Sequence, residues 1–311
     1  MKQNIVMTIR NVCWVVLIIV VAFACQSDEN ELTTEQKELL ATDAAESNLT
    51  ILSAAMDVMD ITSDAFGDKG IAGGRQSTIG KKRGGPNGQC IPAISGSFDI
   101  DRTHRDSLIY TGSFIIDYGD GKSCSGDSTR VRKGRIIDTF TYIISFRDSL
   151  SFSVSESISF EGFYKDSISI DGTFTSVRKS SGVTSMNISG AKLTYADGTS
   201  ATWSGTLDTR QDEGLNPRSW DDDIKTITGS VTGVTRGGSA FSASITSGIV
   251  YRYECFNKWK TVPVSGVISI TAGGDTSTVD YGDGTCDKTY SITVNGETTT
   301  HTFDEHKKSH G

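Results

Sequence analysis

From residue 90 to residue 304 the chain reads as short β-strands separated by tight turns, with no stretch typical of a crossover helix. The dipeptides Asp197-Gly198, Gly237-Gly238 and Asn295-Gly296 favour two-residue hairpin turns. Parallel strands need a crossover of a dozen or more residues, so this pattern favours antiparallel pairing. We therefore predict a mainly β fold for residues 90–304, a large curled antiparallel meander sheet, either open or closed into a barrel-like form. A parallel β-solenoid is the alternative, but no fixed short repeat of that kind is visible.

Apolar and polar residues alternate in several of the expected strands. In 241–245 and 290–294 an apolar residue stands at every second position. Ser and Thr fill many of the positions between them. This period of two predicts half-buried strands, with one face toward a core and the other toward water.

Residues 32–66 are predicted to form a helical segment. Thr33 and Gln36 have the spacing of a capping box, and apolar residues recur downstream at helical intervals. Ser47-Asn48 is a candidate interruption of the helix, and its apolar stripe is expected to pack onto the β domain. The same spacing predicts an exposed acidic edge formed by Asp57, Asp60 and Asp64.

Residues 67–89 are rich in glycine and basic residues. Gly-rich loops can cradle phosphate, but no strand leads here into a Gly-Lys-Ser/Thr element. A flexible linker is the favoured interpretation. A polar tail over 305–311 is predicted to be disordered.

Cys25 determines where the chain is expected to reside. It follows a leader, residues 1–24, with the basic residues Lys2 and Arg10 and the apolar run Val12–Ala24. A basic start, a short apolar stretch and small residues at the cut are typical of an export signal. The run is too short for a membrane-spanning anchor, which needs about 20 apolar residues. A cysteine directly after the cut predicts a lipoprotein signal peptide, with Cys25 carrying the lipid (palmitate); a plain secretory peptide is the alternative.

Residues 25–31 form an acidic tether. An acidic run directly after a lipidated cysteine resembles the surface-export signal of Bacteroidota lipoproteins, and the resemblance implies display at the outer membrane, facing outward. A solvated linker explains the same charges. The expected partner is the membrane, held through the N-terminal lipid.

The chain is acidic, with a formal charge of −8 that becomes −10 when Lys2 and Arg10 leave with the leader. Nucleic-acid binding needs a basic footprint, so nucleic acid is excluded as an expected partner. No cofactor motif is present, and we predict no cofactor.

Four cysteines remain outside the leader and the lipidation position. Exported chains meet oxidising conditions, so an even number of cysteines suggests two disulfides, for which three connectivities exist. No CxxC spacing supports a metal site. The short separations, each ending at the same local motif, favour the pairs Cys90–Cys124 and Cys255–Cys286.

That local motif is an internal repeat. Asp117-Tyr118-Gly119-Asp120-Gly121 returns as Asp280-Tyr281-Gly282-Asp283-Gly284, with a cysteine shortly after each copy. Together with Cys25 and the helix, the repeat resembles a family of uncharacterised Bacteroidota lipoproteins with two Asp-aromatic-Gly-x-Gly-x-Cys turns. The resemblance also includes Arg132-Lys133-Gly134-Arg135-Ile136 and Ala201-Thr202-Trp203, and it implies location and fold only.

The acidic residues of the first turn are candidate calcium ligands. Asp117, Asp120 and Asp127 supply fewer ligands than the DxDxDG pattern does. A turn with glycine at positive φ, and Asp bonded to its own backbone, explains the residues more simply.

No catalytic set stands out. Three of the four histidines lie near the C-terminus, and no Ser-His-Asp or Cys-His arrangement can be argued. Trp203, Trp220 and Asp221 are candidate ligand-binding residues, because indoles beside acids stack on sugars; core packing is the commoner role of a strand Trp. We therefore expect a non-enzymatic binding or structural envelope protein, with glycan or an envelope component as partner. The alternative is a hydrolase of polysaccharide or peptide that uses acids of Asp221–Asp223.

Overall fold

The computed structural model describes residues 33–68, 92–123, 131–147, 149–212, 223–255 and 262–303. These residues form a long α-helix, a short 3-10 helix and one β-sheet, so the predicted mainly β fold is confirmed. The elements are α2 (Thr34–Asp68), β1 (Ala93–Asp101), β2 (Ser107–Asp117), β3 (Lys122–Ser123), β4 (Val131–Ser145), β5 (Ser151–Lys165), β6 (Ile168–Lys179), β7 (Val183–Thr194), β8 (Ser200–Asp212), β9 (Ile224–Val234), β10 (Ala240–Arg252), η1 (Tyr253–Cys255), β11 (Ser265–Ala272), β12 (Asp275–Asp283), β13 (Thr289–Val294) and β14 (Glu297–Thr302).

The sheet is an antiparallel meander, as predicted. Its strands lie in chain order from β1 to β14, with the two-residue β3 pairing beside this path with β4. The sheet is not closed, so the barrel-like alternative is wrong. A reason is that α2 covers the apolar face of the strands, which closure into a barrel would otherwise have to bury.

The three predicted turn dipeptides all lie at turns between adjacent strands. Asn295 and Gly296 both have positive φ, as a two-residue type I′ turn requires. The other two loops are longer than predicted, spanning five residues at 195–199 and at 235–239. In each of them the glycine, Gly198 or Gly238, takes the left-handed conformation, and its N–H bonds to the carbonyl three residues before it.

Helix α2 begins with the predicted capping box. The Thr33 hydroxyl accepts a hydrogen bond from the Gln36 backbone N–H at 3.3 Å, and the Gln36 side chain accepts one from the Thr33 N–H at 2.9 Å. The helix runs unbroken through Ser47-Asn48 and ends at Asp68, so the expected interruption is wrong. Both residues are 2% exposed, and Ser47 accepts a hydrogen bond from the backbone of Arg236 in the β9–β10 loop. These polar residues therefore lie on the buried side of the helix, where the sheet stabilises it.

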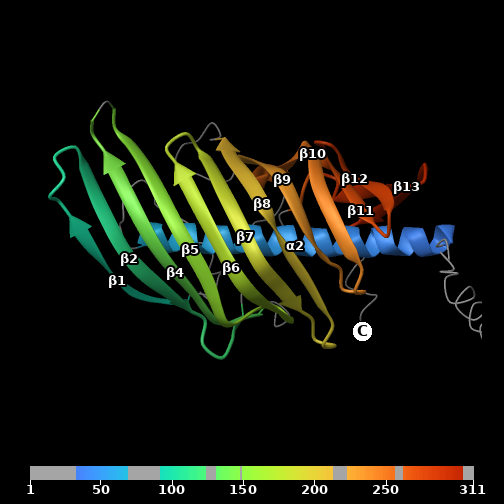
Figure 1. Ribbon diagram of the computed structural model, residues 1–311, viewed down its shortest axis with the longest axis horizontal. Coiled ribbons are helices and arrows are strands. Elements are labelled where there is room, and N and C mark those ends of the chain that lie inside the picture. Colours follow the sequence, from blue (N-terminus) through green and yellow to red (C-terminus); the bar gives the residue numbers. More distant parts are fainter. Residues whose placement is uncertain are drawn as a thin grey trace, which may run out of the picture. The chain divides into compact units, whose positions relative to one another are not determined.

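From Lys37 onward the helix crosses the strands, as Figure 1 shows. Its N-terminal part contacts β12, its middle contacts the loop between β9 and β10, and its C-terminal part contacts β5 and β4. The helix thus meets the strands in the reverse of their chain order. The polar contacts that mark this path join Lys37 to Asp275, Asp43 to Gly237, Lys165 to Ser53 and Asp57 to Arg132.

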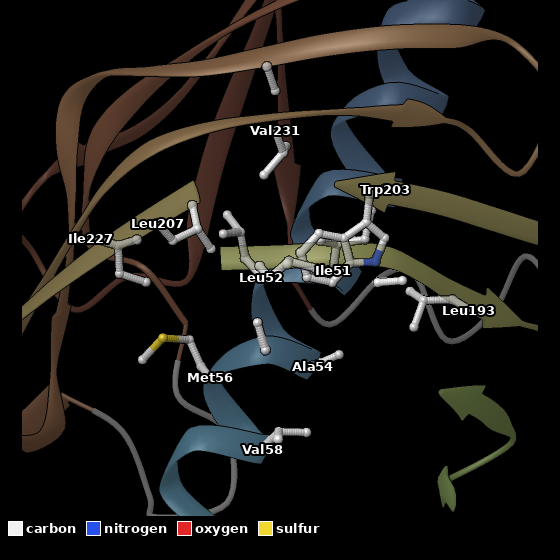
Figure 2. Close-up of a cluster of buried hydrophobic side chains, with 14 of the residues drawn as sticks. Ile51, Leu52, Ala54, Met56, Val58, Leu193, Trp203, Leu207, Ile227 and Val231 are labelled. Atoms are coloured by element: carbon white, nitrogen blue, oxygen red, sulfur yellow. The ribbon is translucent and has the colours of Figure 1, made fainter. Parts of the chain in front are cut away.

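The main core lies between α2 and the sheet. Ile51 and Leu52 of the helix are at most 1% exposed, and Figure 2 shows them among Leu193, Trp203 and Leu207 of strands β7 and β8. We call this side of the sheet the inner face and the opposite side the outer face. Among the described residues, no helix has the length and apolar character needed to cross a membrane.

Candidate functional site

One of the two predicted disulfides lies within the described residues. Cys255 of η1 and Cys286 are bonded, with their Cα atoms 5.1 Å apart, as predicted. The bond ties the end of β10 to the segment between β12 and β13. The residues Cys25, Cys90 and Cys124 lie outside the described residues, so lipidation and the other pair stay predictions.

Trp203 takes the packing role rather than an exposed one. It is 1% exposed, belongs to the main core and has its ring centroid 5.6 Å from that of Phe174. An indole so placed offers no ring face to a ligand in solvent. The other two candidate binding residues, Trp220 and Asp221, lie outside the described residues.

The two Asp-Tyr-Gly-Asp-Gly copies share one hydrogen bond, from a glycine N–H to the first Asp, although most of the second copy lies within β12. Asp117 accepts a hydrogen bond from the Gly119 N–H at 2.7 Å, and Asp280 accepts one from the Gly282 N–H at 2.9 Å. The backbone N–H of Gly119, followed by the guanidinium of Arg135, lowers the pKa of Asp117. This is the Asp-to-backbone turn that the sequence favours over calcium. The tyrosines of both turns, Tyr118 and Tyr281, are at most 2% exposed, so the repeat anchors an aromatic ring in the core.

In the described part of the chain, no group of three or more His, Cys, Asp or Glu side chains has the arrangement of a metal site.

The outer face carries an unbroken row of small polar residues that crosses every strand of the meander. Each member pairs directly across the sheet with the next, in the registers of neighbouring strands. None of the members is buried. The hydroxyl row, as we call it, consists of Ser97, Ser113, Thr139, Ser157, Thr175, Asn187, Thr206, Ser230, Ser244, Ser269, Thr278, Thr293 and Thr298.

The members of the hydroxyl row are spaced by the sheet itself. Neighbouring strands lie about 4.8 Å apart, so polar groups repeat at about that interval along the row. Some are already engaged with each other: the Thr293 and Thr298 hydroxyls are 2.9 Å apart, and Thr139 donates to the Ser157 carbonyl at 3.3 Å. Alternation predicts polar residues on this face, but only the register between strands brings them into one row.

The inner face contains a second unusual feature, a diagonal of charged residues on β4, β5 and β6. Asp138 is 0% exposed and lies between Phe114 and Ile158, its cross-strand partners. Glu156 lies one strand further, opposite Phe140, and accepts a hydrogen bond from Ser176 at 2.6 Å. Arg178 completes the diagonal on β6, opposite Val154.

Burial dominates the protonation of these acids. Together with the charge of Glu156, and against the opposing charge of Arg178, burial raises the pKa of Asp138 to about 8. Burial also raises the pKa of Glu156, against Arg178 and the Ser176 hydrogen bond. Neither carboxyl oxygen of Asp138 has a hydrogen-bond partner in the described structure. Burial therefore favours the protonated form of Asp138, and a buried carboxyl without a hydrogen-bond partner is costly to the folded state.

Comparisons of the chain with protein families, with curated proteins and with solved structures found no match.

Proposed function

We propose that this protein is a lipid-anchored protein of the outer membrane that faces outward and binds a neutral polysaccharide through its outer face, without turnover. The anchor rests on the export leader and Cys25, and the orientation on the acidic tether that follows. The observation that carries the binding function is the hydroxyl row, which crosses all strands of the meander on a face that no described element covers.

A polysaccharide suits this surface chemically. A Ser or Thr hydroxyl both donates and accepts hydrogen bonds, as a sugar hydroxyl does, so either orientation of the pair can be satisfied. The spacing of about 4.8 Å along the row is of the size of one sugar unit in an extended chain. Each successive sugar unit of a polymer that lies along the row can therefore contact another polar side chain.

Charge selects a neutral polymer. The chain without its leader has a formal charge of −10, which repels nucleic acid and anionic polysaccharides. The hydroxyl row itself contains no ionisable residue. Hydrogen bonding is then the interaction that remains available along this surface.

Sheet twist favours a single flexible chain over a flat crystalline surface. Adjacent strands rotate by about 20–25° relative to each other, so a row across many strands follows a coiled path. A single polysaccharide chain can follow this path, whereas the flat surface of a crystalline polysaccharide would contact only a few strands at once.

The binding function is tested with a panel of neutral and anionic polysaccharides and the double variant Thr175→Val/Thr206→Val, which removes two hydroxyls from the middle of the row. Valine keeps the shape and the strand preference of threonine. Two lost hydrogen bonds should weaken binding about tenfold or more. Thr111→Val, in a neighbouring row of the outer face, is the matched control and should bind like the parent. Equal losses in both proteins, or no binding to any neutral polysaccharide, would contradict the proposal.

The same panel separates binding from turnover. Release of reducing ends from a bound polysaccharide would support the hydrolase alternative instead, with Asp222→Asn as the variant that should abolish it.

The anchor is tested by palmitate labelling and by protease treatment of intact cells. The parent protein should incorporate palmitate and be cleaved from outside, whereas Cys25→Ala should incorporate none. Labelling of the variant would disprove lipidation at Cys25, and full protection of the parent would disprove outward display.

A further inference from the structure

In the described part of the chain the meander has two edge strands, β1 and β14, each paired on one side only. β1 lies at one end of the sheet in Figure 1. It pairs with β2 over all nine of its residues without a register shift. The free side of such a strand offers a row of backbone N–H and C=O groups with which another chain can pair.

Two hydrogen bonds at the ends of β2 show which backbone groups of β1 point to its free side. The Phe146 N–H donates to the Asp106 carbonyl, and the Tyr118 N–H donates to the Gly134 carbonyl. Hydrogen-bonded pairs alternate along an antiparallel ladder, so the even-numbered residues of β2 bond to β4 and the odd-numbered ones bond to β1. Through the register of β1 with β2, the odd-numbered residues of β1 bond to β2. The residues whose backbone groups point to the free side are then Ile94, Gly96, Phe98 and Ile100.

This free side lacks the features that usually protect an edge strand. None of its four residues is charged, and β1 contains no Lys, no Pro and no bulge. The acids Asp99 and Asp101 bond through their backbones to β2 and lie on the outer face. On the inner face, Phe98 and Ile100 are 38% and 37% exposed. The other edge, β14, is a six-residue strand without an apolar residue, so β1 is the edge with more to gain from pairing.

The sequence of β1 is complementary to itself when two copies run antiparallel and are centred on Ser97. Ile94 then faces Ile100 of the second copy, and Gly96 faces Phe98 of the second copy. All four free-side residues are paired in this arrangement, and each facing pair exchanges two main-chain hydrogen bonds.

Glycine opposite phenylalanine is already the pattern of pairing between β1 and β2. Phe98 lies opposite Gly112, and Gly96 lies opposite Phe114. A Cβ added at Gly112 would lie 2.6 Å from the Phe98 Cβ, and one added at Gly96 would lie 3.1 Å from the Phe114 ring. Each glycine therefore leaves space for a ring of the neighbouring strand. A second copy would place its Phe98 beside Gly96 in the same way.

The charges of β1 suit the register centred on Ser97. Asp99 faces Ser95 of the second copy and Asp101 faces Ala93, so no acid lies opposite another acid. The two Asp99 side chains are then separated by four residues along the strands, or about 13 Å at a rise of about 3.3 Å per residue.

The neighbouring registers are less favourable. Centring the pair on Phe98 would bring the two Asp99 side chains within two residues of each other, and like charges that lie close across a sheet destabilise it. Centring it on Gly96 would place Pro92 opposite Ile100. Proline has no N–H to donate, so one main-chain hydrogen bond would be lost at each end of the pair.

We propose that the protein forms a two-fold dimer in which the β1 edges of two copies pair antiparallel, centred on Ser97. This pairing closes at two copies, whereas pairing of β1 with β14 of the next copy would build an open filament. Directly opposed residues lie on the same face of a sheet, so Ser97 meets Ser97 of the second copy and the two hydroxyl rows become continuous. A gain in polysaccharide affinity from the longer row rests on the proposed function, but the dimer itself does not.

The dimer is tested by sedimentation velocity without any polysaccharide. The chain from residue 25 onward, with Cys25→Ala to exclude the lipid, is measured over about 1–200 µM. One pair of strands makes a small interface, so we expect a monomer–dimer equilibrium with a Kd on the order of 10 µM. A monomer at every concentration, or species larger than a dimer, would overturn the proposal. Loss of polysaccharide binding in a protein that still dimerises would count against the proposed function alone.

Cross-linking tests the register. Opposed residues of a non-hydrogen-bonded pair have Cα atoms about 4.5 Å apart, within the range of a disulfide. Ser97→Cys should therefore give a covalent dimer under mild oxidation, beyond the level of the parent with its native cysteines. Ser95→Cys is the matched control and should not link to itself, but a mixture of Ser95→Cys and Asp99→Cys should link. None of the three positions is buried, so folding is not at risk. Equal linking of Ser97→Cys and Ser95→Cys would disprove this register.

A proline on the free side tests the main-chain pairing. Ile100→Pro removes an N–H that points away from β2, a position at which an edge strand tolerates proline. Each copy loses a hydrogen bond to the other, so the dimer should weaken at least tenfold. Ile100→Val keeps the N–H and the strand preference, and should dimerise more tightly than Ile100→Pro. Parent-like dimerisation of Ile100→Pro, or equal weakening by both substitutions, would refute pairing through this edge.

Discussion

Asp57 of α2 and Arg132 of β4 form an ion pair in which each side chain is only 18% exposed. Burial works to lower the pKa of Arg132, but the Asp57 carboxylate and Tyr118 raise it, so the guanidinium stays charged. Lys165 of β5 adds a second, longer contact to Asp57 at 3.9 Å. The sequence predicts an exposed acidic edge for Asp57, and this is wrong, because two basic residues of the sheet lie against it.

Breaking this pair should destabilise the protein. Asp57→Asn leaves Arg132 in a site with little solvent and no carboxylate from the helix. We expect a loss of about 2 kcal/mol in the free energy of unfolding, since removing one partner leaves the other charge partly buried without its ion pair. Urea unfolding followed by circular dichroism measures it. Asp171→Asn, an exposed acid on β6, is the control and should change stability by less than about 0.5 kcal/mol.

The helix offers a matched pair of leucines for measuring the core. Leu52 is 1% exposed against the sheet, whereas Leu39 of the same helix is 65% exposed. Leu52→Ala should reduce the free energy of unfolding by about 2–5 kcal/mol, through lost transfer energy and the cavity left behind. Leu39→Ala should stay within about 0.5 kcal/mol of the parent. Equal effects of the two substitutions in urea unfolding would show that the helix is not docked through this face.

Asp138 makes stability depend on pH in the direction opposite to an acid whose pKa is lowered by folding. Its pKa is about 8 in the folded protein and near the usual value of 3.8 in the unfolded chain. Between these values the folded state holds a proton that the unfolded state has released, so raising the pH favours unfolding. The contribution of Asp138 to the free energy of unfolding should therefore be greatest below about pH 4 and should fall as the pH rises toward 8. Glu156, whose pKa is also raised, acts in the same direction.

Urea unfolding at pH 5 and at pH 8 checks this dependence. Asp138→Asn cannot titrate, so it should show a smaller loss between the two pH values than the parent does. A steeper loss in the variant, or greater stability of the parent at pH 8, would refute the assignment.

The disulfide Cys255–Cys286 closes a loop with a sequence separation of 31 residues. In the chain-entropy view, a cross-link of that length stabilises the folded state by about 3.5 kcal/mol. Cys255→Ser/Cys286→Ser should lose a comparable amount in denaturant unfolding, and reductant should destabilise the parent but not the variant at this bond. Peptide mapping without reduction should recover Cys255 linked to Cys286; recovery of Cys255 linked to Cys90 would contradict the structure.

Local rules predict much of this fold. Asn295-Gly296 forms the expected two-residue turn, and the Thr33–Gln36 capping box starts the helix, because both depend on neighbours in the chain. Asp197-Gly198 predicts the position of a turn correctly but not its length. A five-residue loop with one left-handed glycine is compatible with the same dipeptide.

The features that sequence reasoning missed depend on contacts between distant segments. Ser47-Asn48 does not interrupt the helix, because the β9–β10 loop supplies a hydrogen bond that local propensity cannot anticipate. Thr175 and Thr206 belong to one row only through the registers of β6, β7 and β8. Asp138 has no motif around it, and a surface position in a strand would have been the ordinary expectation for an acid.

The reversed path of the helix across the strands has a consequence for the order of folding. The contacts of α2 with the sheet span 75 residues for Asp57 with Arg132, 112 for Ser53 with Lys165, 194 for Asp43 with Gly237 and 238 for Lys37 with Asp275. The N-terminal part of the helix is synthesised first, but the strand that it contacts is synthesised last among these partners. Because distant contacts cost more loop entropy, docking should begin at the C-terminal end of the helix and proceed backward toward its start as each hairpin is added. A chain that emerges with its N-terminus first can thus assemble this core only progressively, from the C-terminal end of the helix toward its start.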